Sequence, residues 1–322
     1  MIVGSGWVGR QIAARLATFG ITVGLTDKDA DTIEDAYQWI VCSQGSIQHP
    51  LSLGGLSTST RENEDSTMHI NHSLSVEAAS GTQETPSSSR ASRTFDLAKL
   101  VEKLESFNRL TRDQVVAWQA GLAIESVPEQ ISLKRRVLRR ISDLVSEDCI
   151  IVSNSSYFVP SLLSQFVQHP NRYAHLHFHV PVLRDSVADI VGCESTSSQV
   201  VQRLAELCHR IQQHPLILKR EHPGYVFNWL LQSVLKAALE LVASDVAEIE
   251  DIDLSWKSVT GMSVGPFGMM DQIGIDVIDQ VLSNSRWAES GQINTQKLLA
   301  VLRPLIEKGR LGTKTQAGFY EY

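Results

Sequence analysis

The sequence predicts an α/β protein: a Rossmann-like, doubly wound parallel sheet followed by a second, all-helical domain. Strand and helix patterns alternate through the first two thirds of the chain, which is typical of a mostly parallel sheet. The alternation stops at His222-Pro223-Gly224, and only helical patterns follow. We therefore expect two domains, residues 1–221 and residues 222–322.

A glycine-rich stretch at the start of the chain specifies the first domain. A short apolar segment leads into Gly4-Ser5-Gly6-Trp7-Val8-Gly9. A helical pattern follows it, and a second strand over residues 21–26 ends at Asp27. Strand, glycine turn, helix, strand and acid in this order are the pattern of a dinucleotide-binding unit.

Each glycine of the turn has a physical reason. Gly4 permits the tight turn, Gly6 lets the main chain approach a pyrophosphate, and Gly9 lets the helix pack close to the strand. The N–H groups at the start of the helix then attract the phosphates. Only three residues precede the first glycine, so we expect a very short first strand. The residues expected to hold the cofactor here are Gly4, Gly6, Trp7, Val8 and Gly9.

Asp27 indicates which dinucleotide is bound. Its carboxylate can accept hydrogen bonds from both ribose hydroxyls and would repel a 2′-phosphate, which favours NAD over NADP. Lys28 beside it weakens that preference. The alternative is a glycine turn in an α/β protein that binds nothing.

Composition narrows the classes of partner. The chain has 322 residues, of which 43% are hydrophobic and 20% charged, as in ordinary globular proteins. Its formal net charge of -7 argues against nucleic acid or an anionic membrane as the main partner. No apolar run approaches the ~20 residues of a membrane span. Four scattered cysteines without a CxxC pair fit a reducing compartment. We expect no signal or transit peptide and a cytoplasmic location.

Residues 51–94 interrupt the alternating pattern. The segment is rich in Ser and Thr and poor in aromatic residues. Such a composition buries too little apolar surface to offset the entropy of ordering, so we expect a disordered surface insertion. A phosphorylated or partner-binding segment is the alternative.

The remaining elements follow from apolar periodicity. In the first domain we expect helices over residues 30–42, 96–104, 134–144, 160–167 and 200–211, and strands over residues 120–127, 149–154, 173–180 and 189–191. In the second domain we expect helices over residues 225–246, 255–260, 268–283 and 295–308.

Seven short blocks follow one another in an order that is typical of one enzyme family. They are residues 4–9, Ile124-Glu125-Ser126-Val127-Pro128-Glu129 with Lys134, Ser153-Asn154-Ser155-Ser156, Tyr173-Ala174-His175-Leu176-His177-Phe178 with Pro181-Val182, Pro223-Gly224-Tyr225-Val226-Phe227-Asn228, Gly265-Pro266-Phe267-Gly268, and Gly312-Thr313-Lys314-Thr315 with Gly318-Phe319-Tyr320. The chain resembles the 3-hydroxyacyl-CoA dehydrogenase family. The resemblance implies a Rossmann-like NAD domain, a helical domain that forms most of a homodimer contact, oxidation of a hydroxyl beside an acyl group, and a place in fatty acid metabolism.

The resemblance also implies four catalytic residues. His177 corresponds to the base that takes the hydroxyl proton, a role that suits an imidazole at neutral pH. Asp189 corresponds to the acid that orients the imidazole. Ser156 and Asn228 correspond to donors that bind the substrate oxygen and stabilise the developing charge. Taken alone, a histidine on a strand is more often a core residue.

A metal site is the competing explanation for these histidines. His175, His177 and His179 alternate along one strand and could share one face. Only Asp185 and Asp189 lie near them in the sequence, and no ligand spacing is present, so we expect no metal.

Further contacts follow from the same resemblance. Glu129, Lys134, Ser156 and Lys314 match family positions near the cofactor, and Ser43 matches a position that contacts CoA. The alternative is that Glu129 caps the next helix and that Lys134 and Lys314 are solvated surface charges.

Several positions depart from the family pattern. Asp189 stands in place of the family's Glu and is one methylene shorter. Val180-Pro181-Val182 replaces the family's Asn-Pro-Val. At positions 179 and 229 the family usually has residues other than the His179 and Trp229 of this chain. Pro50 replaces a lysine that binds CoA phosphates. The insertion also occupies the place of the family's helical CoA-binding arm.

We therefore expect a small-molecule substrate that is an acyl-CoA or a smaller hydroxy acid, interconverted with its 3-oxo form. The alternative is a catalytically weak or inactive relative that binds NAD and has a structural or interaction role.

Overall fold

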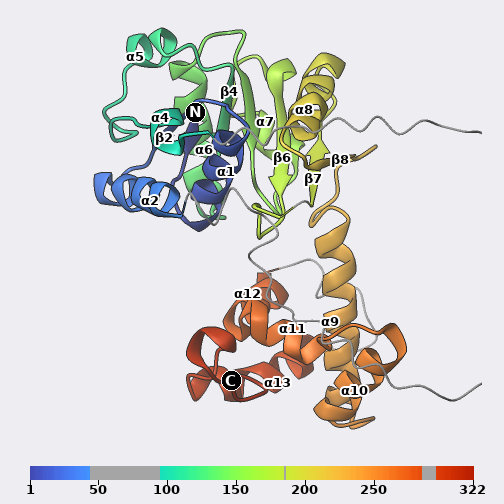
Figure 1. The fold of residues 1–322 in the computed structure, drawn as a ribbon. Helices are drawn as coiled ribbons and strands as arrows, with labels where there is room; N and C mark the ends of the chain where they lie inside the picture. The colour runs from blue at the N-terminus through green and yellow to red at the C-terminus, as the bar shows by residue number, and fades with distance from the viewer. Residues whose placement is uncertain (44–94, 185, 285–294) are drawn as a thin grey trace, which may run out of the picture. The chain divides into compact units, whose positions relative to one another are not determined.

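The computed structural model describes residues 1–43, 95–184, 186–284 and 295–322. They form two compact units, Met1–Glu221 and His222–Tyr322 (Figure 1). The whole of the expected insertion at residues 51–94 lies outside the described residues, as does Asp185.

The first unit is built on an eight-stranded sheet with the order β3-β2-β1-β4-β5-β6-β7-β8. All neighbouring strands are parallel except β6 and β7, which are antiparallel. The strand order reverses between β1 and β4, and the carboxyl ends of strands at such a point form the ligand-binding crevice of doubly wound folds. The strands are β1 (Ile2–Val3), β2 (Val23–Thr26), β3 (Val101–Lys103), β4 (Leu122–Glu125), β5 (Ile150–Ser153), β6 (Tyr173–Phe178), β7 (Val187–Val191) and β8 (His214–Ile217).

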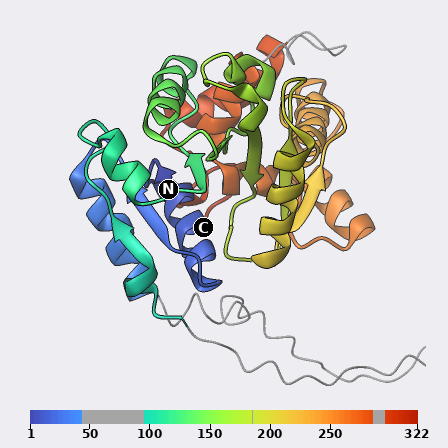
Figure 2. The ribbon, with the colours of Figure 1, turned by 90° about the horizontal axis from the view of Figure 1, so that it is seen from above.

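Helices cover both faces of this sheet (Figure 2). One buried cluster joins α1, α2, α4 and α8 to one face, and a second joins α5, α6 and α7 to the other. The predicted doubly wound α/β class is therefore confirmed. The helices are α1 (Trp7–Thr18), α2 (Ala30–Cys42), α4 (Leu97–Leu100), α5 (Arg112–Ala117), α6 (Ile131–Leu144), α7 (Pro160–Ser164), the short η2 (Pro170–Arg172) and α8 (Ser198–Arg210).

Three predictions about elements of the first unit were wrong or incomplete. The helix expected over residues 96–104 stops at Leu100, because Val101 pairs with Val23 of β2 and becomes a buried residue of β3. Helix α5 and strand β8 were not expected. Strand β8 has a weak sequence signal, His-Pro-Leu-Ile, and forms by pairing with β7.

The second unit is helical, as predicted. In the described part of this unit, the residues outside the helices form no strand, only isolated β-bridges near the C-terminus. One expected helix, residues 268–283, is broken at Gly274, whose φ of 109° does not suit a helix. The helices are α9 (Phe227–Ala243), α10 (Ile249–Thr260), α11 (Pro266–Ile273), α12 (Ile275–Asn284), α13 (Thr295–Glu307) and the short η4 (Thr313–Thr315).

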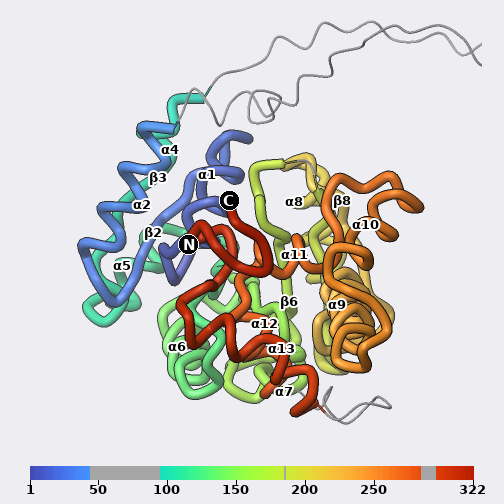
Figure 3. The backbone as a smooth tube through the Cα atoms, turned by 90° about the horizontal axis from the view of Figure 1, so that it is seen from below, coloured from blue at the N-terminus to red at the C-terminus, as the bar shows by residue number. Residues whose placement is uncertain are grey.

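Two buried carboxylates tie the helical unit together. Asp271 of α11 accepts hydrogen bonds from the main-chain N–H groups of Phe319 and Tyr320, both at 2.9 Å. Asp253 of α10 accepts from the N–H groups that begin α11. The C-terminal segment therefore folds back onto α11 (Figure 3). Among the described residues, no helix has the length and apolar character needed to cross a lipid bilayer.

Candidate active site

The glycine turn after β1 is shaped as a cradle. Gly4 has a φ of 101°, and a Cβ there would lie 2.5 Å from the carbonyl oxygen of Ser126. A Cβ on Gly9 would lie 1.9 Å from the carbonyl oxygen of Gly4, so only glycine lets α1 start this close to the turn. At Gly6 nothing lies within 4 Å of the Cβ position. The turn therefore leaves its main chain open at the residue where a pyrophosphate would approach.

Asp27 lies beside this turn, directly after β2. Its Oδ2 accepts a hydrogen bond of 2.8 Å from the main-chain N–H of Ser5, and its Oδ1 accepts one of 2.7 Å from the N–H of Lys28. The acid and the glycine turn thus form one structure at the carboxyl ends of β1 and β2. These residues fit the adenosine half of a dinucleotide.

The two residues between the last glycines begin helix α1. Val8 is half-buried against the core, and the Trp7 side chain is 56% exposed. Trp7 packs edge-on against Trp39 of α2 with ring centroids 5.8 Å apart, and the guanidinium of Arg10 lies 5.6 Å and 5.7 Å from the two ring centroids. The main-chain N–H groups of Trp7 and Val8 lie in the first turn of α1, where phosphates are attracted.

Lys134 is buried, with 1% of its side chain exposed. Its Nζ lies 2.8 Å from Oε1 of Glu125, which is fully buried, and 3.2 Å from Oε2 of Glu129. It also donates to the carbonyl oxygen of Val127 at 3.1 Å. Lys134 is therefore not the solvated surface charge that we considered as an alternative. Its direct contact with a cofactor stays a prediction.

Glu129 connects two loops at the carboxyl edge of the sheet. Its Oε1 accepts hydrogen bonds from the Oγ of Ser155 and from the N–H groups of Tyr157 and Phe158. The N-cap of α6 is Gln130, so the idea that Glu129 caps that helix was wrong. Glu129 instead fixes the loop that follows β5.

That loop carries Ser156, which is half-buried between β5 and α7. Oδ1 of Asn154 accepts a 2.9 Å hydrogen bond from the N–H of Phe178, the residue after His177. The Oγ of Ser153 donates to Oε2 of Glu125 at 2.5 Å. The loop with Ser156 is therefore held against the end of β6 that bears His177.

His177 and Asp189 are paired directly across β6 and β7. The antiparallel register places the two residues opposite each other, and Nδ1 of His177 donates to Oδ2 of Asp189 at 3.0 Å. The Asp189 side chain is fully buried and His177 is 6% exposed. The shorter acid at position 189 therefore still reaches the imidazole.

Burial dominates the electrostatics of this pair. It lowers the pKa of His177, and the hydrogen bond to Asp189 offsets only part of that effect. Burial also raises the pKa of Asp189, but the hydrogen bonds from His177 and His179 outweigh it, so the net direction is downward. The pair is therefore a neutral imidazole beside a carboxylate at neutral pH.

His179 shares the same acid. Its Nε2 donates to Oδ2 of Asp189 at 2.9 Å, and its ring lies 4.6 Å from that of His177. In the part of the chain that the structure describes, these three residues form the one group of His, Cys, Asp or Glu whose ligand atoms lie close enough to hold a metal, within 4.8 Å of one another. The expected absence of a metal stays a prediction.

The sequence drew attention to His179 but missed its link to Asp189. The spacing of two residues from His177 places both rings on one face of the strand. The third histidine, His175, is fully buried and instead shares a 2.8 Å hydrogen bond with the hydroxyl of Tyr173. Glu125, the buried partner of Lys134, was not singled out either.

Three predicted residues belong to elements other than those that carry this cluster. Ser43 is the C-cap of α2. Asn228 is the second residue of α9 in the helical unit, and Lys314 lies in η4, where it pairs with Asp276. Their predicted roles stay predictions.

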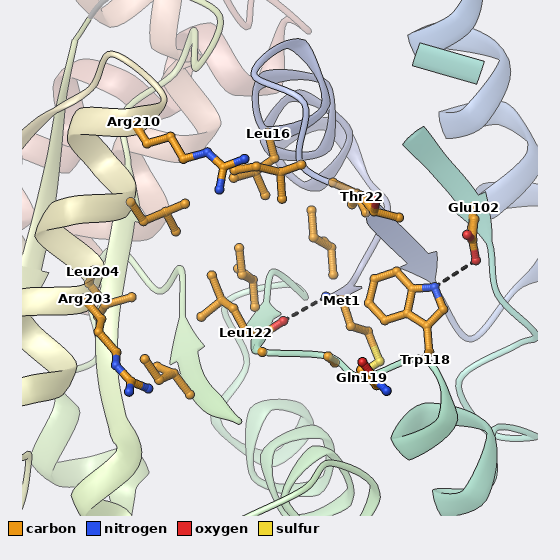
Figure 4. A pocket seen from close by; sticks show the side chains of 18 of the residues that line it. Met1, Leu16, Thr22, Glu102, Trp118, Gln119, Leu122, Arg203, Leu204 and Arg210 are labelled. Carbon is orange, nitrogen blue, oxygen red and sulfur yellow. Dashed lines mark hydrogen bonds between the residues drawn. The ribbon is translucent and has the colours of Figure 1, made fainter. Parts of the chain in front are cut away.

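A cavity of about 660 Å³ lies at the other end of the sheet, and Figure 4 shows its lining. Its walls include Met1, Val23 and Leu122, which stand at the amino ends of their strands. The N-terminal ammonium donates to the carbonyl oxygen of Leu122 at 2.8 Å, and burial lowers its pKa to about 5. The cavity contains none of the predicted site residues, so it is separate from the candidate active site.

Comparison with known proteins identifies the family. The family model for the NAD-binding domain of 3-hydroxyacyl-CoA dehydrogenase matches residues 65–221, and the model for its C-terminal domain matches residues 224–322. Mitochondrial hydroxyacyl-coenzyme A dehydrogenase from Rattus norvegicus is 29% identical over 226 residues, which are 70% of this chain and 71% of the relative.

Two solved structures share the fold. A diketoreductase that acts on dicarbonyl compounds is 26% identical, with a TM-score of 0.76, covering 100% of this chain and 97% of the other. (S)-3-hydroxybutyryl-CoA dehydrogenase from Ralstonia eutropha has 21% identity, the same TM-score of 0.76 and the same coverage of 100% and 97%. The chain belongs to the 3-hydroxyacyl-CoA dehydrogenase family and is an NAD-dependent oxidoreductase.

Proposed function

We propose that this protein interconverts a 3-hydroxyacyl substrate and its 3-oxo form, with His177 as the base. The observation that carries the proposal is the hydrogen bond from Nδ1 of His177 to the buried Asp189. Because Nδ1 carries the proton in that bond, the lone pair of the neutral ring is on Nε2. Nε2 then takes the proton of the substrate hydroxyl, and Asp189 stabilises the imidazolium that results.

The cofactor is held by the glycine turn and its acid. Bound NAD supplies the acceptor for the hydride that leaves the substrate carbon. Gly4, Gly6 and Gly9, with the main chain of Trp7 and Val8, form the cradle for the pyrophosphate, and Asp27 binds the ribose. We assign Glu129, Lys134 and Lys314 to the surroundings of the cofactor as well.

Ser156 and Asn228 are proposed donors to the substrate oxygen. Hydrogen bonds aimed at an oxygen that gains negative charge stabilise the transition state more than the ground state. The support for Ser156 is the anchoring of its loop to β6 through Asn154. Asn228 is proposed on its position in the Pro-Gly-Tyr-Val-Phe-Asn block, and Ser43 on its match to a position that contacts CoA.

The substrate is an acyl-CoA or a free hydroxy acid of the same chemistry. The rat relative is named a hydroxyacyl-coenzyme A dehydrogenase, whereas the diketoreductase acts on dicarbonyl compounds. Pro50 in place of a phosphate-binding lysine supports the smaller substrate. A role in fatty acid metabolism follows if the acyl-CoA is preferred.

Oxidation of NADH by the purified protein tests the activity. Acetoacetyl-CoA and free 3-oxo acids are offered in turn, and we expect turnover with one class. His177→Gln should lower kcat by roughly 10²–10⁴-fold and leave NADH binding intact. His209→Gln, at an exposed position on α8, is the matched control and should be fully active. Normal NADH binding without turnover on any substrate would contradict the proposal and support the inactive-relative alternative.

We also propose a homodimer formed through the helical unit. Several large apolar side chains there are well exposed, among them Leu230 at 60%, Leu241 at 40%, Leu254 at 59% and Val259 at 84%. Large exposed apolar side chains are a feature of protein interfaces, and they support the proposal. Light scattering should give twice the mass of one chain, and Leu254→Glu should shift the protein toward the monomer.

A cytoplasmic location is proposed from the cysteines. All four cysteines of the chain are among the described residues and are free thiols. Free thiols are typical of a reducing compartment. Fractionation of cells that express a tagged protein tests the location, and enrichment in mitochondria would contradict it.

A further inference from the structure

We propose that His179 is a positioning residue, which holds the carboxylate of Asp189 in the orientation that His177 needs. The inference rests on the proposed role of His177 as the base. It goes beyond that role because it adds His179 to the pair of His177 and Asp189, which gives a unit of three side chains.

The geometry of the unit is set by two strands. His177 and His179 are two residues apart on β6 and its continuation, so both rings lie on one face of the sheet. Asp189 is opposite His177 in the antiparallel register of β7. Both rings donate to the same oxygen, Oδ2, at 3.0 Å and 2.9 Å. The rings contact each other edge to face, with planes 73° apart.

Asp189 depends on these two donors. Its other oxygen, Oδ1, is buried and has no hydrogen-bond partner among the described residues. Without His179, the side chain would keep only the hydrogen bond from His177 among those described. The terminal torsion of Asp is soft, so a single hydrogen bond would restrict the carboxylate poorly. A buried carboxylate with too few donors is also expensive to keep charged.

The second donor therefore offsets the short side chain. Aspartate is one methylene shorter than glutamate, which is the acid expected at this position from the resemblance to the family. A shorter acid reaches the imidazole from a fixed backbone with less freedom to adjust. The ring of His179 adds a second hydrogen bond to the same oxygen, Oδ2, and so restricts the carboxylate that holds Nδ1 of His177.

Neighbouring charges act on the same unit. Glu129 raises the pKa of His177, whereas a positive charge on His179 lowers it. His175 is also buried, and its burial, together with the charges of Lys134 and His177, keeps the pKa of His175 well below its usual value. Because the charge of His179 acts on the pKa of His177, removal of His179 should change the pH profile as well as the rate.

The competing explanation for His177, His179 and Asp189 is a site that binds a divalent cation. A bound Zn²⁺ would lie about 2.0–2.2 Å from each ligand atom and would displace the shared protons. The nitrogen–oxygen distances of 3.0 Å and 2.9 Å are those of N–H···O hydrogen bonds. We therefore argue for hydrogen bonds and make the cation an outcome of the test.

Four variants test the proposal: His179→Phe, His179→Gln, Asp189→Glu, and the double variant His179→Phe with Asp189→Glu. Phe keeps a ring and removes the donor, so kcat should fall about 10–100-fold, as for other residues that orient a functional group through a hydrogen bond. KM should change little, and the acidic limb of the kcat/KM profile should move. Gln supplies an N–H donor and should retain most of the activity. In the double variant the longer acid should recover part of the loss.

The control is His209→Phe on the exposed face of α8, which should leave all these parameters unchanged. Thermal unfolding of each variant separates a loss of activity from a loss of folded protein. If His179→Phe matches the wild type in kcat and in the pH profile, the positioning role is wrong while the proposed function stands. Tight Zn²⁺ binding by the wild type, lost in His179→Phe with no change in metal-free activity, would also overturn it.

A measurement without turnover keeps the two proposals distinguishable. Titration of ¹⁵N-labelled histidines by NMR reports the ionisation of His177 directly. We expect the His177 titration to shift in His179→Phe and to return toward the wild-type curve in His179→Gln. This result would support the positioning role even if no substrate is turned over, and an unshifted titration would contradict it.

Discussion

Asp189 lies directly opposite His177 in the antiparallel pairing of β6 with β7, and the two side chains meet through a 3.0 Å hydrogen bond. The antiparallel register between the two strands thus brings the proposed base and its acid together. β7 runs antiparallel to β6 on one side and parallel to β8 on the other. The polarity of this one strand therefore determines which side chain faces the imidazole.

The stability of the protein should fall as the pH decreases from 7.5 to 5.5. Burial lowers the pKa of His175 and His177 in the folded state, whereas an unfolded histidine titrates near ~6.5. Below that pH the unfolded chain binds protons that the folded chain does not, so the free energy of unfolding decreases. Asp189 affects the pH dependence only at lower pH. Its pKa in the folded state is below the ordinary value, so the stability that its carboxylate provides is lost only when that acid becomes protonated.

Urea unfolding at three pH values measures this dependence. His177→Gln should lose less stability between pH 7.5 and 5.5 than the wild type, since one buried titrating group is gone. His209→Gln, at an exposed position, should follow the wild-type slope. Equal slopes for wild type and His177→Gln would show that burial does not suppress the protonation of His177.

Gly9 and Gly6 should respond to alanine in opposite ways. At Gly9 the new Cβ would lie 1.9 Å from the main-chain oxygen of Gly4, so Gly9→Ala should destabilise the fold by about 1–3 kcal/mol or more. At Gly6 the space is open and φ is −63°, so Gly6→Ala should fold normally. Gly6→Ala should instead weaken NADH binding, because the methyl group occupies the approach to the main chain.

Denaturation without cofactor and fluorescence titration with NADH separate the two effects. The proposal for the glycine turn requires that Gly6→Ala affects binding with little effect on stability. If Gly6→Ala binds NADH as tightly as the wild type, the cradle is not where the pyrophosphate lies.

Lys134→Met should be far more destabilising than Lys314→Met. Lys134 is 1% exposed, and its removal would leave the buried carboxylate of Glu125 without its counter-ion, a situation that typically costs about 3–5 kcal/mol. Lys314 pairs with Asp276 at the surface, with the two side chains 45% and 42% exposed, where the loss is usually below about 1 kcal/mol. Chemical denaturation of both variants measures the difference, and similar losses would mean that the pair with Glu125 contributes little.

Asp27→Ala should weaken NAD binding more than NADP binding. The carboxylate is the group expected to accept from the ribose hydroxyls and to repel a 2′-phosphate. Asp35→Ala, in the exposed middle of α2, is the control for the loss of one negative charge. The ratio of the two dissociation constants is the informative quantity, and a wild-type preference for NADP would overturn the choice of cofactor.

Local sequence was sufficient for the glycine turn. The spacing of Gly4, Gly6 and Gly9, followed by Asp27, specified a turn whose constraints act between residues near one another in the chain or in adjacent strands. The structure shows those constraints as close approaches at Gly4 and Gly9 and as open space at Gly6. The helical character of the second unit was equally predictable, because apolar periodicity is a property of each segment.

Non-local pairing was harder to predict from the sequence. Residues 101–103 carried a helical pattern and became strand β3, since pairing with β2 satisfied their backbone and buried Val101. Strand β8 formed on β7 in the same way. Lys134 was predicted near the cofactor, with a solvated surface charge as the alternative; it is buried, because the carboxylates of Glu125 and Glu129 converge on it.

The sequence by itself determined the dinucleotide turn, the two classes of domain and the identity of the candidate base. The tertiary structure decided which groups surround that base. Side chains twelve residues apart met because two strands run antiparallel, and His179 joined them because strand geometry repeats every second residue. The composition and the residue spacing of a chain do not specify which way a strand runs or how it is aligned with its neighbour. These two properties brought His177, His179 and Asp189 together.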